Sequence, residues 1–424
     1  MTFRQAEEYL LGLELFGMRF GLDRMHKLMT VLGLPQRRFA SVHVVGTNGK
    51  SSTVRFCTAI LARHGLRAGS YTSPHLGSFR ERIEVGEEPV SEADFAAAVQ
   101  QAAHAAELVN RTQDSDDRVT QFEALTAAAY HELARRDVEV AVIEAGLGGR
   151  FDATNVIPSK VQVLTTVGLE HTRWLGPTLM DIAAEKLAVV RDHGDLVVGD
   201  LEPDLHALAR RTAADHSTRL VEPAADRGVA LRAPGRFQRR NFALAAAAAQ
   251  AFLGRPLDQH AVERAGAETR IPGRLDVVAE SPLTVYDGAH NPEGAGALAD
   301  SLDDVLGDHR PRVAVIGVLE DKDAAGMLKA LLPHVDTAIF TRSSNPRSLP
   351  PATLATLAEK IMERSDRPAT DATVPRPETV LDPRAAVERA RLTAGPGGAV
   401  LATGSIYLVA DLVRERPSAR ASTL

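Results

Sequence analysis

One stretch near the N-terminus changes from strand chemistry to helix chemistry across a turn framed by glycines, and it reads VHVVGTNGKSSTV (residues 42–54). The valines before the turn suit a buried parallel strand, and the residues after it carry apolar side chains at helical spacing. Gly46 and Gly49 allow the backbone to turn tightly and to point N–H groups at an anion on the helix N-terminus. This pattern predicts a loop that binds the phosphates of a nucleotide.

The loop also places a cation and two hydroxyls beside the predicted anion. Lys50 is positioned to contact the outer phosphates, and Ser51 or Ser52 can offer an oxygen to a magnesium ion. The widest form of the phosphate-loop pattern, G-x-x-x-x-G-K-[ST], needs a glycine where this chain has Val44. The shorter form G-T-N-G-K is present instead. An ordinary Gly-Asn turn with a solvated lysine is the alternative that the loop alone leaves open.

Length and composition restrict the class of protein. The 424 residues are enough for two or three domains, and we expect two. With 49 Lys and Arg against 55 Asp and Glu, the net charge of −6 gives no basic excess for binding nucleic acid. The single cysteine, Cys57, forms no internal disulfide, and we find no pattern of a signal peptide or a membrane span. We therefore expect a cytoplasmic protein with neither a nucleic-acid nor a membrane partner.

Strand-like and helix-like patterns alternate along the chain. This alternation predicts an α/β fold whose N-terminal domain, residues 1–272, has a mostly parallel sheet with helices on both faces. A Pro-Gly pair within 268–278 predicts a linker between this domain and the next. For residues 273–424 the alternating pattern predicts a smaller Rossmann-like α/β domain. Within the N-terminal domain we expect strands at 138–144 and 160–171, a helix at 179–190, and a short strand followed by a mobile, arginine-rich segment within 66–85.

Polar residues stand where predicted strands end, and ligands of open parallel sheets bind at those ends. Besides the loop with Lys50, these residues are Ser73, Glu144 and His171. A carboxylate, a hydroxyl and an imidazole around ATP could hold magnesium, although histidine is an uncommon ligand for this ion and also serves as a structural hydrogen-bonding group. Glu144 is the most informative, because a carboxylate that closes an apolar strand is costly to bury unpaired. For Lys186, the residue pattern alone favours a solvated helix lysine.

Ten short segments in a fixed chain order carry a family resemblance, which covers the chain from about residue 9 to residue 413. They are GTNGK (46–50), YTSPHLGSFRERI (71–83), IEAGLGGRFDATNV (143–156), GLEHTRWLG (168–176), AAEKL (183–187), QRRN (238–241), IPGRLD (271–276), DGAHNP (287–292), GVLEDKD (317–323) and TGSIYLVADLV (403–413). Together they resemble the folylpolyglutamate synthase and dihydrofolate synthase family, which belongs with the Mur ligases. The resemblance implies a ligase in which a folate carboxylate attacks the γ-phosphate of ATP, and the amine of L-glutamate then displaces phosphate from the acyl phosphate.

The resemblance also implies roles for individual residues. The implied nucleotide contacts are Asn48, Gly49, Lys50, Ser51, Ser52, Asn241, Arg274 and Asp287. The implied ligands of two Mg²⁺ ions are Ser73, Glu144, His171 and Lys186, with Lys186 carbamylated on its amine. The implied catalytic residues are Lys50, His171 and Lys186. The implied contacts of the folate or dihydropteroate substrate are Arg19, Phe20, Gly21, Gln121, Phe122, Phe151, Asp152 and Ala153.

Two positions depart from the family pattern. Ser51 stands where many members have a third loop glycine, although Mur ligases have threonine there, so we expect nucleotide binding to survive. Arg19 stands where some dihydrofolate synthases have an aspartate that can bond the pterin ring. This reversal of charge leaves open whether dihydropteroate, tetrahydrofolate or both are accepted.

Three other functions are the alternatives. A peptidoglycan Mur ligase needs a further domain ahead of the phosphate loop, and about forty residues are too few to build one. A nucleotide-binding module without catalysis and a simple phosphotransferase come from different classes, and glutamate-dependent phosphate release separates them from a ligase. We expect a monomer. Four arginines could meet glutamate carboxylates or be solvated, namely Arg80, Arg82, Arg342 and Arg347.

Overall fold

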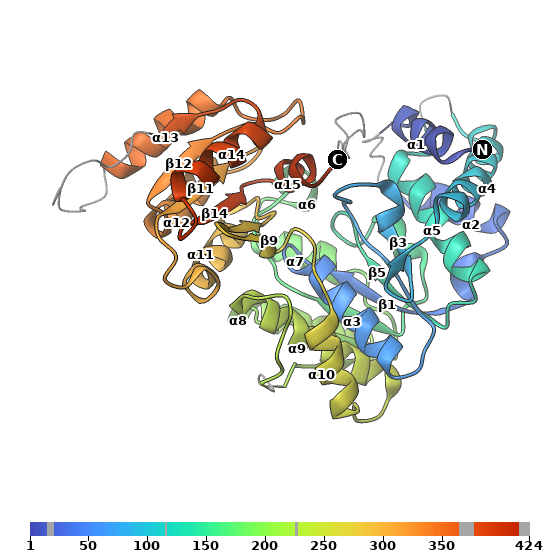
Figure 1. The fold of residues 1–424 in the computed structure, drawn as a ribbon. Helices are drawn as coiled ribbons and strands as arrows, with labels where there is room; N and C mark the ends of the chain where they lie inside the picture. The colour runs from blue at the N-terminus through green and yellow to red at the C-terminus, as the bar shows by residue number, and fades with distance from the viewer. Residues whose placement is uncertain (15–20, 115–116, 225–227, 364–376, 415–424) are drawn as a thin grey trace.

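In the part of the chain that the structure describes, the backbone forms two sheets, each with helices packed against it (Figure 1). The computed structural model describes residues 1–14, 21–114, 117–224, 228–363 and 377–414. We call the sheet β1–β8 with its helices the N-terminal domain, and the sheet β9–β14 with its helices the C-terminal domain. The α/β fold with two sheets confirms the predicted fold class.

The N-terminal sheet has eight strands in the order β4-β3-β2-β5-β1-β6-β7-β8. Neighbours from β2 to β8 pair in parallel, whereas β3 and β4 form an antiparallel edge. The strands are β1 (Ala40–Val45), β2 (Ala68–Tyr71), β3 (Ile83–Val85), β4 (Glu88–Pro89), β5 (Val140–Glu144), β6 (Val161–Leu164), β7 (Asp195–Val198) and β8 (Arg219–Val221).

Helices cover both faces of this sheet. The α-helices are α1 (Phe3–Gly12), α2 (Asp23–Val31), α3 (Lys50–Arg63), α4 (Glu92–Asn110), α5 (Gln121–Arg135), α6 (Thr172–Leu175), α7 (Leu179–Leu187), α8 (Pro203–Asp215), α9 (Arg236–Leu253) and α10 (Gln259–Glu268). Strand β5 shows the two faces directly, because alternate residues point in opposite directions. Val140 and Val142 belong to the core with α3 and α9, and Ala141 and Ile143 belong to the core with α4 and α5.

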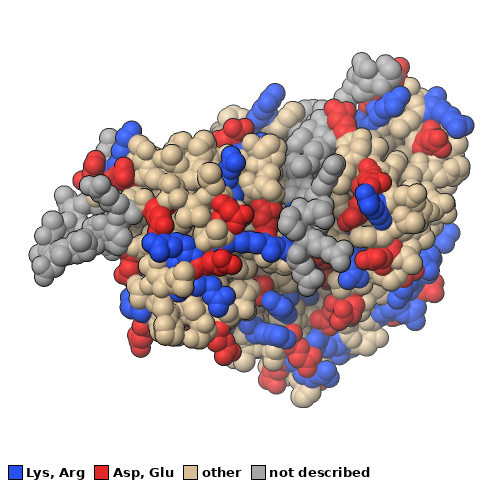
Figure 2. All heavy atoms as spheres, turned by 45° about the horizontal axis from the view of Figure 1, so that its top comes forward, with Lys and Arg blue, Asp and Glu red and all other residues tan. Residues whose placement is uncertain are grey.

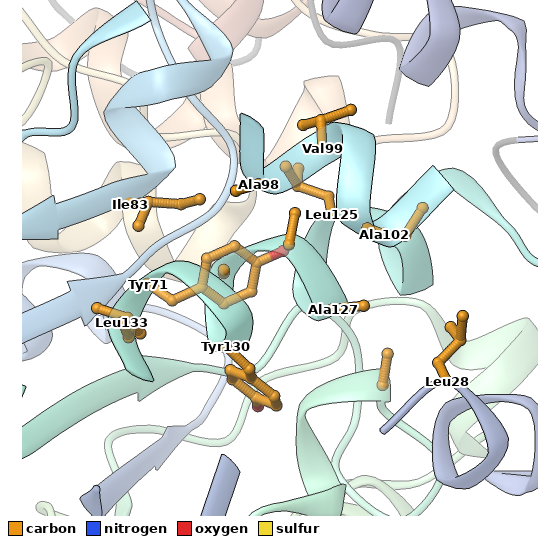
Figure 3. Close-up of a cluster of buried hydrophobic side chains, with 14 of the residues drawn as sticks. Leu28, Tyr71, Ile83, Ala98, Val99, Ala102, Leu125, Ala127, Tyr130 and Leu133 are labelled. Atoms are coloured by element: carbon orange, nitrogen blue, oxygen red, sulfur yellow. The ribbon is translucent and has the colours of Figure 1, made fainter. Parts of the chain in front are cut away.

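The core on the α4–α5 side also fixes a turn that matters for the site (Figure 3). Tyr71 from β2 and Tyr130 from α5 are fully buried there among aliphatic side chains such as Leu125 and Val99. The Tyr130 hydroxyl donates a hydrogen bond to the backbone oxygen of Thr154 at 2.9 Å. This bond ties the turn after β5, which includes the short 3₁₀ helix η3 (Ala153–Val156), to the core.

The C-terminal sheet has six strands in the order β13-β12-β11-β14-β10-β9, and only the pairing of β9 with β10 is antiparallel. The strands are β9 (Asp276–Glu280), β10 (Leu283–Tyr286), β11 (Arg312–Ile316), β12 (Thr337–Phe340), β13 (Glu378–Thr379) and β14 (Ala399–Thr403). The helices are α11 (Pro292–Leu306), α12 (Ala324–Leu331), α13 (Pro351–Glu363), α14 (Pro383–Ala394) and α15 (Ile406–Val413). Buried side chains on both faces of the sheet build two hydrophobic cores. The exact boundary at residues 272 and 273 stays a prediction.

Three details differ from the sequence-based predictions. The strand expected at 160–171 ends at Leu164, and His171 instead caps the N-terminus of α6 with a left-handed φ of 52°. The helix expected at 179–190 ends at Leu187. The segment expected to be mobile folds into the 3₁₀ helix η2 (Phe79–Arg82) and β3, and Arg82 is only 1% exposed. Its Nε donates to Nδ1 of His75 at 3.0 Å, so packing against its own loop removes this arginine from solvent.

Two surface findings bear on possible partners. Within the described ranges, no helix is long and apolar enough to cross a membrane. Figure 2 shows basic and acidic side chains interspersed over the face that it presents. Such mixing gives that face no single-sign field for attracting a polyanion.

Candidate active site

The loop between β1 and α3 has the predicted strand-turn-helix context. Gly46 and Gly49 have φ values of 150° and 86°, and Gly49 caps the N-terminus of α3. A Cβ atom at Gly46 would lie 1.8 Å from Oγ1 of Thr165, and one at Gly49 would lie 2.4 Å from Oδ1 of Asn241. Both glycines are therefore required by the backbone conformation and by the space around the loop.

Lys50 is the first residue of α3, and its side chain folds back over the loop. Its Nζ donates hydrogen bonds to the backbone oxygens of Gly46 and Thr47, both at 3.1 Å. The ammonium thus lies at the mouth of the loop, next to the N-terminus of a 14-residue helix. The helix dipole and the lysine charge act together in favour of an anion at this position.

Glu144, the last residue of β5, lies beside this loop and is 1% exposed. Its Oε1 accepts a hydrogen bond from Oγ of Ser51 at 3.0 Å, and its Oε2 accepts one from the backbone N–H of Ser73 at 3.2 Å. Burial raises the pKa of Glu144, and the charge of Lys50 together with these two hydrogen bonds opposes the rise. Glu144 is therefore buried with hydrogen-bonding partners, as expected from the high cost of burying a carboxylate without them.

The oxygen atoms gathered here fit a magnesium ion. Magnesium is held by one or two carboxylates together with substrate phosphates and water. Glu144, Ser51 and Ser73 offer a carboxylate and two hydroxyls beside the phosphate loop. Among the residues that the structure describes, no three His, Cys, Asp or Glu side chains come together as a metal cage. The carboxylate and the two hydroxyls suit a hard cation that keeps phosphate and water ligands.

Lys186 lies in the last turn of α7 and is 4% exposed, so the solvated-helix alternative is wrong. Its Nζ donates to the backbone oxygen of Gly46 at 2.9 Å. Burial and, second, the nearby charge of Lys50 lower the pKa of Lys186 to about 7, against the opposing effect of carboxylates such as Glu170. At neutral pH, a large share of this amine is therefore uncharged, which is the form that reacts as a nucleophile.

His171 and Glu170 follow one another at the start of α6. Burial is the main cause that lowers the pKa of His171 to about 4; Glu170 opposes this shift, and Lys322 adds to it. The carboxylate of Glu170 contacts two residues of the C-terminal domain, Nζ of Lys322 at 2.9 Å and Nε2 of His290 at 3.2 Å. Burial would raise the pKa of Glu170, but His290 and Lys322 hold it well below its usual range. Glu170 therefore connects the two domains electrostatically.

Three further residues from α9, the linker and the C-terminal domain line the same cavity as the loop. Asp287 follows β10, and its carboxylate accepts hydrogen bonds from backbone N–H groups of Leu275 at 2.9 Å and Ala289 at 2.8 Å. Burial raises the pKa of Asp287, whereas Arg274 lowers it. Asn241 near the start of α9 donates to Oε1 of Gln238 at 3.1 Å. The structure thus brings together all the residues singled out for nucleotide binding.

The cavity has a volume of ≈ 1340 Å³ and lies between the domains. It extends from the phosphate loop to the turn after β5 and to the start of α5. Five of the residues expected to contact folate line it, namely Gly21, Phe122, Phe151, Asp152 and Ala153. A cavity of this size has room for two small-molecule ligands side by side, because single ligand pockets span about 300–1,000 Å³.

Comparisons with known proteins agree with this geometry. The profile of the family described as Mur ligase, glutamate ligase domain, matches residues 273–406. The dihydrofolate synthase/folylpolyglutamate synthase of Mycobacterium tuberculosis is 35% identical over 376 residues, which is 80% of this chain and 77% of that protein. The protein of the same description from Bacillus subtilis is 30% identical over 97% of this chain and 98% of its own length. The chain belongs to the folylpolyglutamate synthase and dihydrofolate synthase family.

A solved structure of a family member has the same fold. The Mycobacterium tuberculosis folylpolyglutamate synthase, in crystal structures with ADP and AMPPCP, superposes with a TM-score of 0.88 at 31% sequence identity. The match covers 97% of this chain and 97% of that chain. Both domains of this family member are therefore present here in the same arrangement.

One described residue that was predicted to contact folate does not line the cavity. Gln121 is not among the residues that line the cavity, because its side chain donates to the backbone oxygen of Leu10 at 2.8 Å. Its role here is to join α5 to α1. Arg19 and Phe20 lie outside the described residues. Asp152 is 5% exposed, and its carboxylate accepts from the backbone N–H of Leu147 at 2.7 Å, so it also organises the turn.

Of the four arginines considered for glutamate, only Arg347 lines the cavity. Sequence reasoning missed Arg24, which lines it from α2 and is 7% exposed. The Arg24 guanidinium is paired with Glu123 at 3.0 Å and with Asp117. No local signal distinguishes Arg24 from a solvated helix arginine. Its partners are distant in sequence and become neighbours only in the fold.

Proposed function

We propose that this protein is an ATP-dependent ligase that joins L-glutamate to the carboxylate of a folate-type substrate. The observation that carries the proposal is a single cavity that contains both a phosphate loop and an aromatic-walled pocket. The printed names of its relatives, dihydrofolate synthase and folylpolyglutamate synthase, support the choice of substrates. Both reactions extend a carboxylate by one glutamate.

In the first step, an oxygen of the substrate carboxylate attacks the γ-phosphorus of ATP. The bond from this phosphorus to the β,γ-bridging oxygen breaks, and the products are an acyl phosphate and ADP. Lys50 and the N-terminus of α3 are placed to stabilise the charge that spreads over the transferring group. Asn241, Arg274 and Asp287 would hold the nucleotide across the two domains.

Magnesium, when bound, neutralises charge on the phosphates. The residues that would hold one or two of these ions are Ser73, Glu144, His171 and a carbamylated Lys186. Carbamylation forms a bond between the neutral Lys186 amine and the carbon of CO₂, and the displaced proton goes to solvent. The lowered pKa of about 7 supports this modification. A carbamate would replace a cation beside the metals by an oxygen ligand.

In the second step, the free amine of L-glutamate attacks the acyl carbon, and the nitrogen releases one proton to solvent as the amide forms. The bond from this carbon to the phosphate oxygen breaks, and inorganic phosphate leaves with the former carboxylate oxygen. The C-terminal side of the cavity carries two cations, Lys322 and Arg347, which contact the carboxylates of Glu170 and Asp321 and would also attract a dicarboxylate amino acid. The position of the cavity between two domains would shield the acyl phosphate from water.

The test is to incubate the protein with ATP, magnesium and L-glutamate, with dihydropteroate or tetrahydrofolate added in separate reactions. The masses of the products are then measured by mass spectrometry. A product heavier by one glutamate residue with dihydropteroate identifies a dihydrofolate synthase. The same gain with tetrahydrofolate identifies a folylpolyglutamate synthase, and we expect both gains. No gain with either substrate would contradict the assignment and point to another carboxylate within the Mur ligases.

We further propose that the enzyme acts as a monomer in the cytoplasm. All the residues named for the site come from one chain, so no second copy is needed to complete it. The charge of −6 and the mixed charges of the visible face support a function without nucleic acid. The elution volume of the purified protein, with light scattering, tests the monomer.

A further inference from the structure

Asn48 of the phosphate loop is held by both domains at once. Its backbone is fixed by the N-terminal domain, because its N–H donates to Oγ1 of Thr166 at 3.0 Å and its oxygen accepts from Oγ1 of Thr165 at 2.6 Å. Its side chain is fixed by the C-terminal domain. Asn48 Nδ2 donates to Oδ1 of Asn291 at 3.3 Å, and Asn291 Nδ2 donates to Oδ1 of Asn48 at 3.2 Å. Glu293 Oε2 accepts another bond from Asn48 Nδ2 at 3.1 Å.

Asn291 is itself anchored in the C-terminal domain. It is the N-cap of α11, where its Oδ1 accepts a hydrogen bond from the backbone N–H of Gly294 at 2.7 Å. Helix α11 is packed into the core of this domain through fully buried residues such as Ala295 and Leu298. Asn291 is 5% exposed, so water competes little for its amide. Its position therefore follows the position of the whole C-terminal domain.

The amide pair acts on the part of the loop that positions Lys50. Asn48 lies between Thr47, whose backbone oxygen accepts from Nζ of Lys50 at 3.1 Å, and Gly49, the N-cap of α3. A movement of the C-terminal domain away from the N-terminal domain breaks the side-chain bonds of Asn48 while its backbone bonds remain. The loop then loses the contacts that restrain it on the side facing the other domain.

We propose that Asn48 and Asn291 are positioning residues of the ligation reaction, whose amide pair holds the phosphate loop in its reactive conformation while the C-terminal domain is docked. This inference rests on the proposed function, because it assigns the pair a part in ligation. The pair makes phosphoryl transfer depend on the docked domain, which also encloses the acyl phosphate. When ATP is bound without docking, its γ-phosphoryl group is then transferred only slowly to the carboxylate, with ADP as the leaving group.

The test uses a variant that keeps the helix cap. Asn291→Ser retains a side-chain oxygen for the N-terminus of α11, but its side chain is too short to pair with Asn48. The loss of two neutral hydrogen bonds should lower kcat about tenfold. Asn48→Ala should lower kcat at least as much. The variant with both substitutions should have a kcat within about twofold of that of Asn48→Ala, because either substitution already removes the interaction between the two amides. Asp382→Ser, an N-cap change on α14 of the same domain, is the matched control and should keep normal kcat.

A second measurement reports docking without any ligation. Fluorophores on introduced cysteines at His104 and Glu388, which are exposed on the two domains, measure their separation by energy transfer. The native Cys57 is fully buried and should not be labelled. With ADP bound, Asn291→Ser should populate larger separations than the wild type.

Each result decides one question. Wild-type kcat in Asn291→Ser, or single effects that multiply in the double variant, would overturn the positioning role while the ligase assignment stands. An unchanged separation of the two fluorophores in Asn291→Ser would overturn the positioning role, even if the wild type gave no ligation product. A missing ligation product by itself argues only against the proposed substrates.

Discussion

Replacing Lys186 by alanine tests the proposed carbamate, and the structure sets the scale of the effect. The pKa of this buried amine falls from an ordinary 10.5 to about 7. At pH 8 about nine in ten such amines are neutral, against about three in a thousand at the ordinary pKa, which is a gain of roughly 300-fold in the form that attacks CO₂. Lys186→Ala removes the modified group, so we expect the ligation rate to fall on the order of 10²- to 10³-fold.

The assay measures glutamate-dependent ADP formation at pH 8. It compares the wild type in CO₂-depleted and bicarbonate-containing buffer, and Lys186→Ala with and without acetate. Depletion should slow the wild type and bicarbonate should restore it, while acetate should recover part of the activity of Lys186→Ala. Lys160→Ala is the control, because Lys160 is an exposed lysine whose Nζ bonds the backbone oxygen of Phe252 at 2.6 Å, away from the cavity. Acetate should have no effect on this variant.

Two results would refute the reasoning about Lys186. Full activity of Lys186→Ala without any addition would make the lysine dispensable, and a wild-type rate indifferent to CO₂ would remove the carbamate. The pH dependence of stability gives an independent check in CO₂-free buffer. Because the folded pKa is lowered to about 7, the folded state binds fewer protons than the unfolded state up to pH 10.5, so this residue makes stability rise with pH across that window. Lys186→Ala should lack this rise.

Three further variants test the other parts of the site. Lys50→Ala should lower turnover more than about 10³-fold with an unchanged melting temperature, and near-normal ligation by the folded variant would contradict its role at the phosphates. Glu144→Gln should melt no lower than the wild type at pH 7, because the raised pKa of Glu144 means that ionising this buried group costs stability above its ordinary pKa of 4.5. The magnesium-dependent rate of this variant should nevertheless fall about 10²-fold. An unchanged magnesium requirement would count against the metal site. Glu170→Gln should melt at a lower temperature than the wild type at pH 7. It should also lose the part of the fall in melting temperature below pH 4.5 that comes from the depressed pKa of Glu170. Melting temperatures that depend on pH identically in the two proteins would exclude the interdomain pairing.

The parts of the site that sequence reasoning predicted are local in the chain. The phosphate loop is set by Gly46, Gly49 and Lys50 within five residues, so its strand-turn-helix context is readable directly. Glu144 stands at the end of an apolar strand, and the common edge of a parallel sheet brings it to the loop. These features follow from backbone chemistry and strand order.

The features that residue patterns alone missed depend on contacts between distant segments, although the family resemblance already implied a place for Lys186 in the site. Lys186 has the pattern of a solvated lysine, and only the packing of α7 against a loop 140 residues earlier buries its amine. The pairing of Glu170 with Lys322 joins residues 152 positions apart in different domains. Arg82 has the charge of a surface residue but lies buried, with its guanidinium carbon 5.4 Å from the centre of the Phe79 ring. No periodicity or motif encodes such distances, because they arise from how elements and domains pack.

The central claim is that the substrate carboxylate attacks ATP directly, and isotope transfer tests it most directly. The folate-type substrate is prepared with ¹⁸O in the carboxylate that receives glutamate. The ¹⁸O content of the inorganic phosphate released during ligation is then measured by mass spectrometry. Attack on the γ-phosphorus followed by displacement with the glutamate amine predicts one ¹⁸O atom in each phosphate released. Phosphate without ¹⁸O, formed together with the glutamate product, would contradict the acyl phosphate and with it the proposed mechanism.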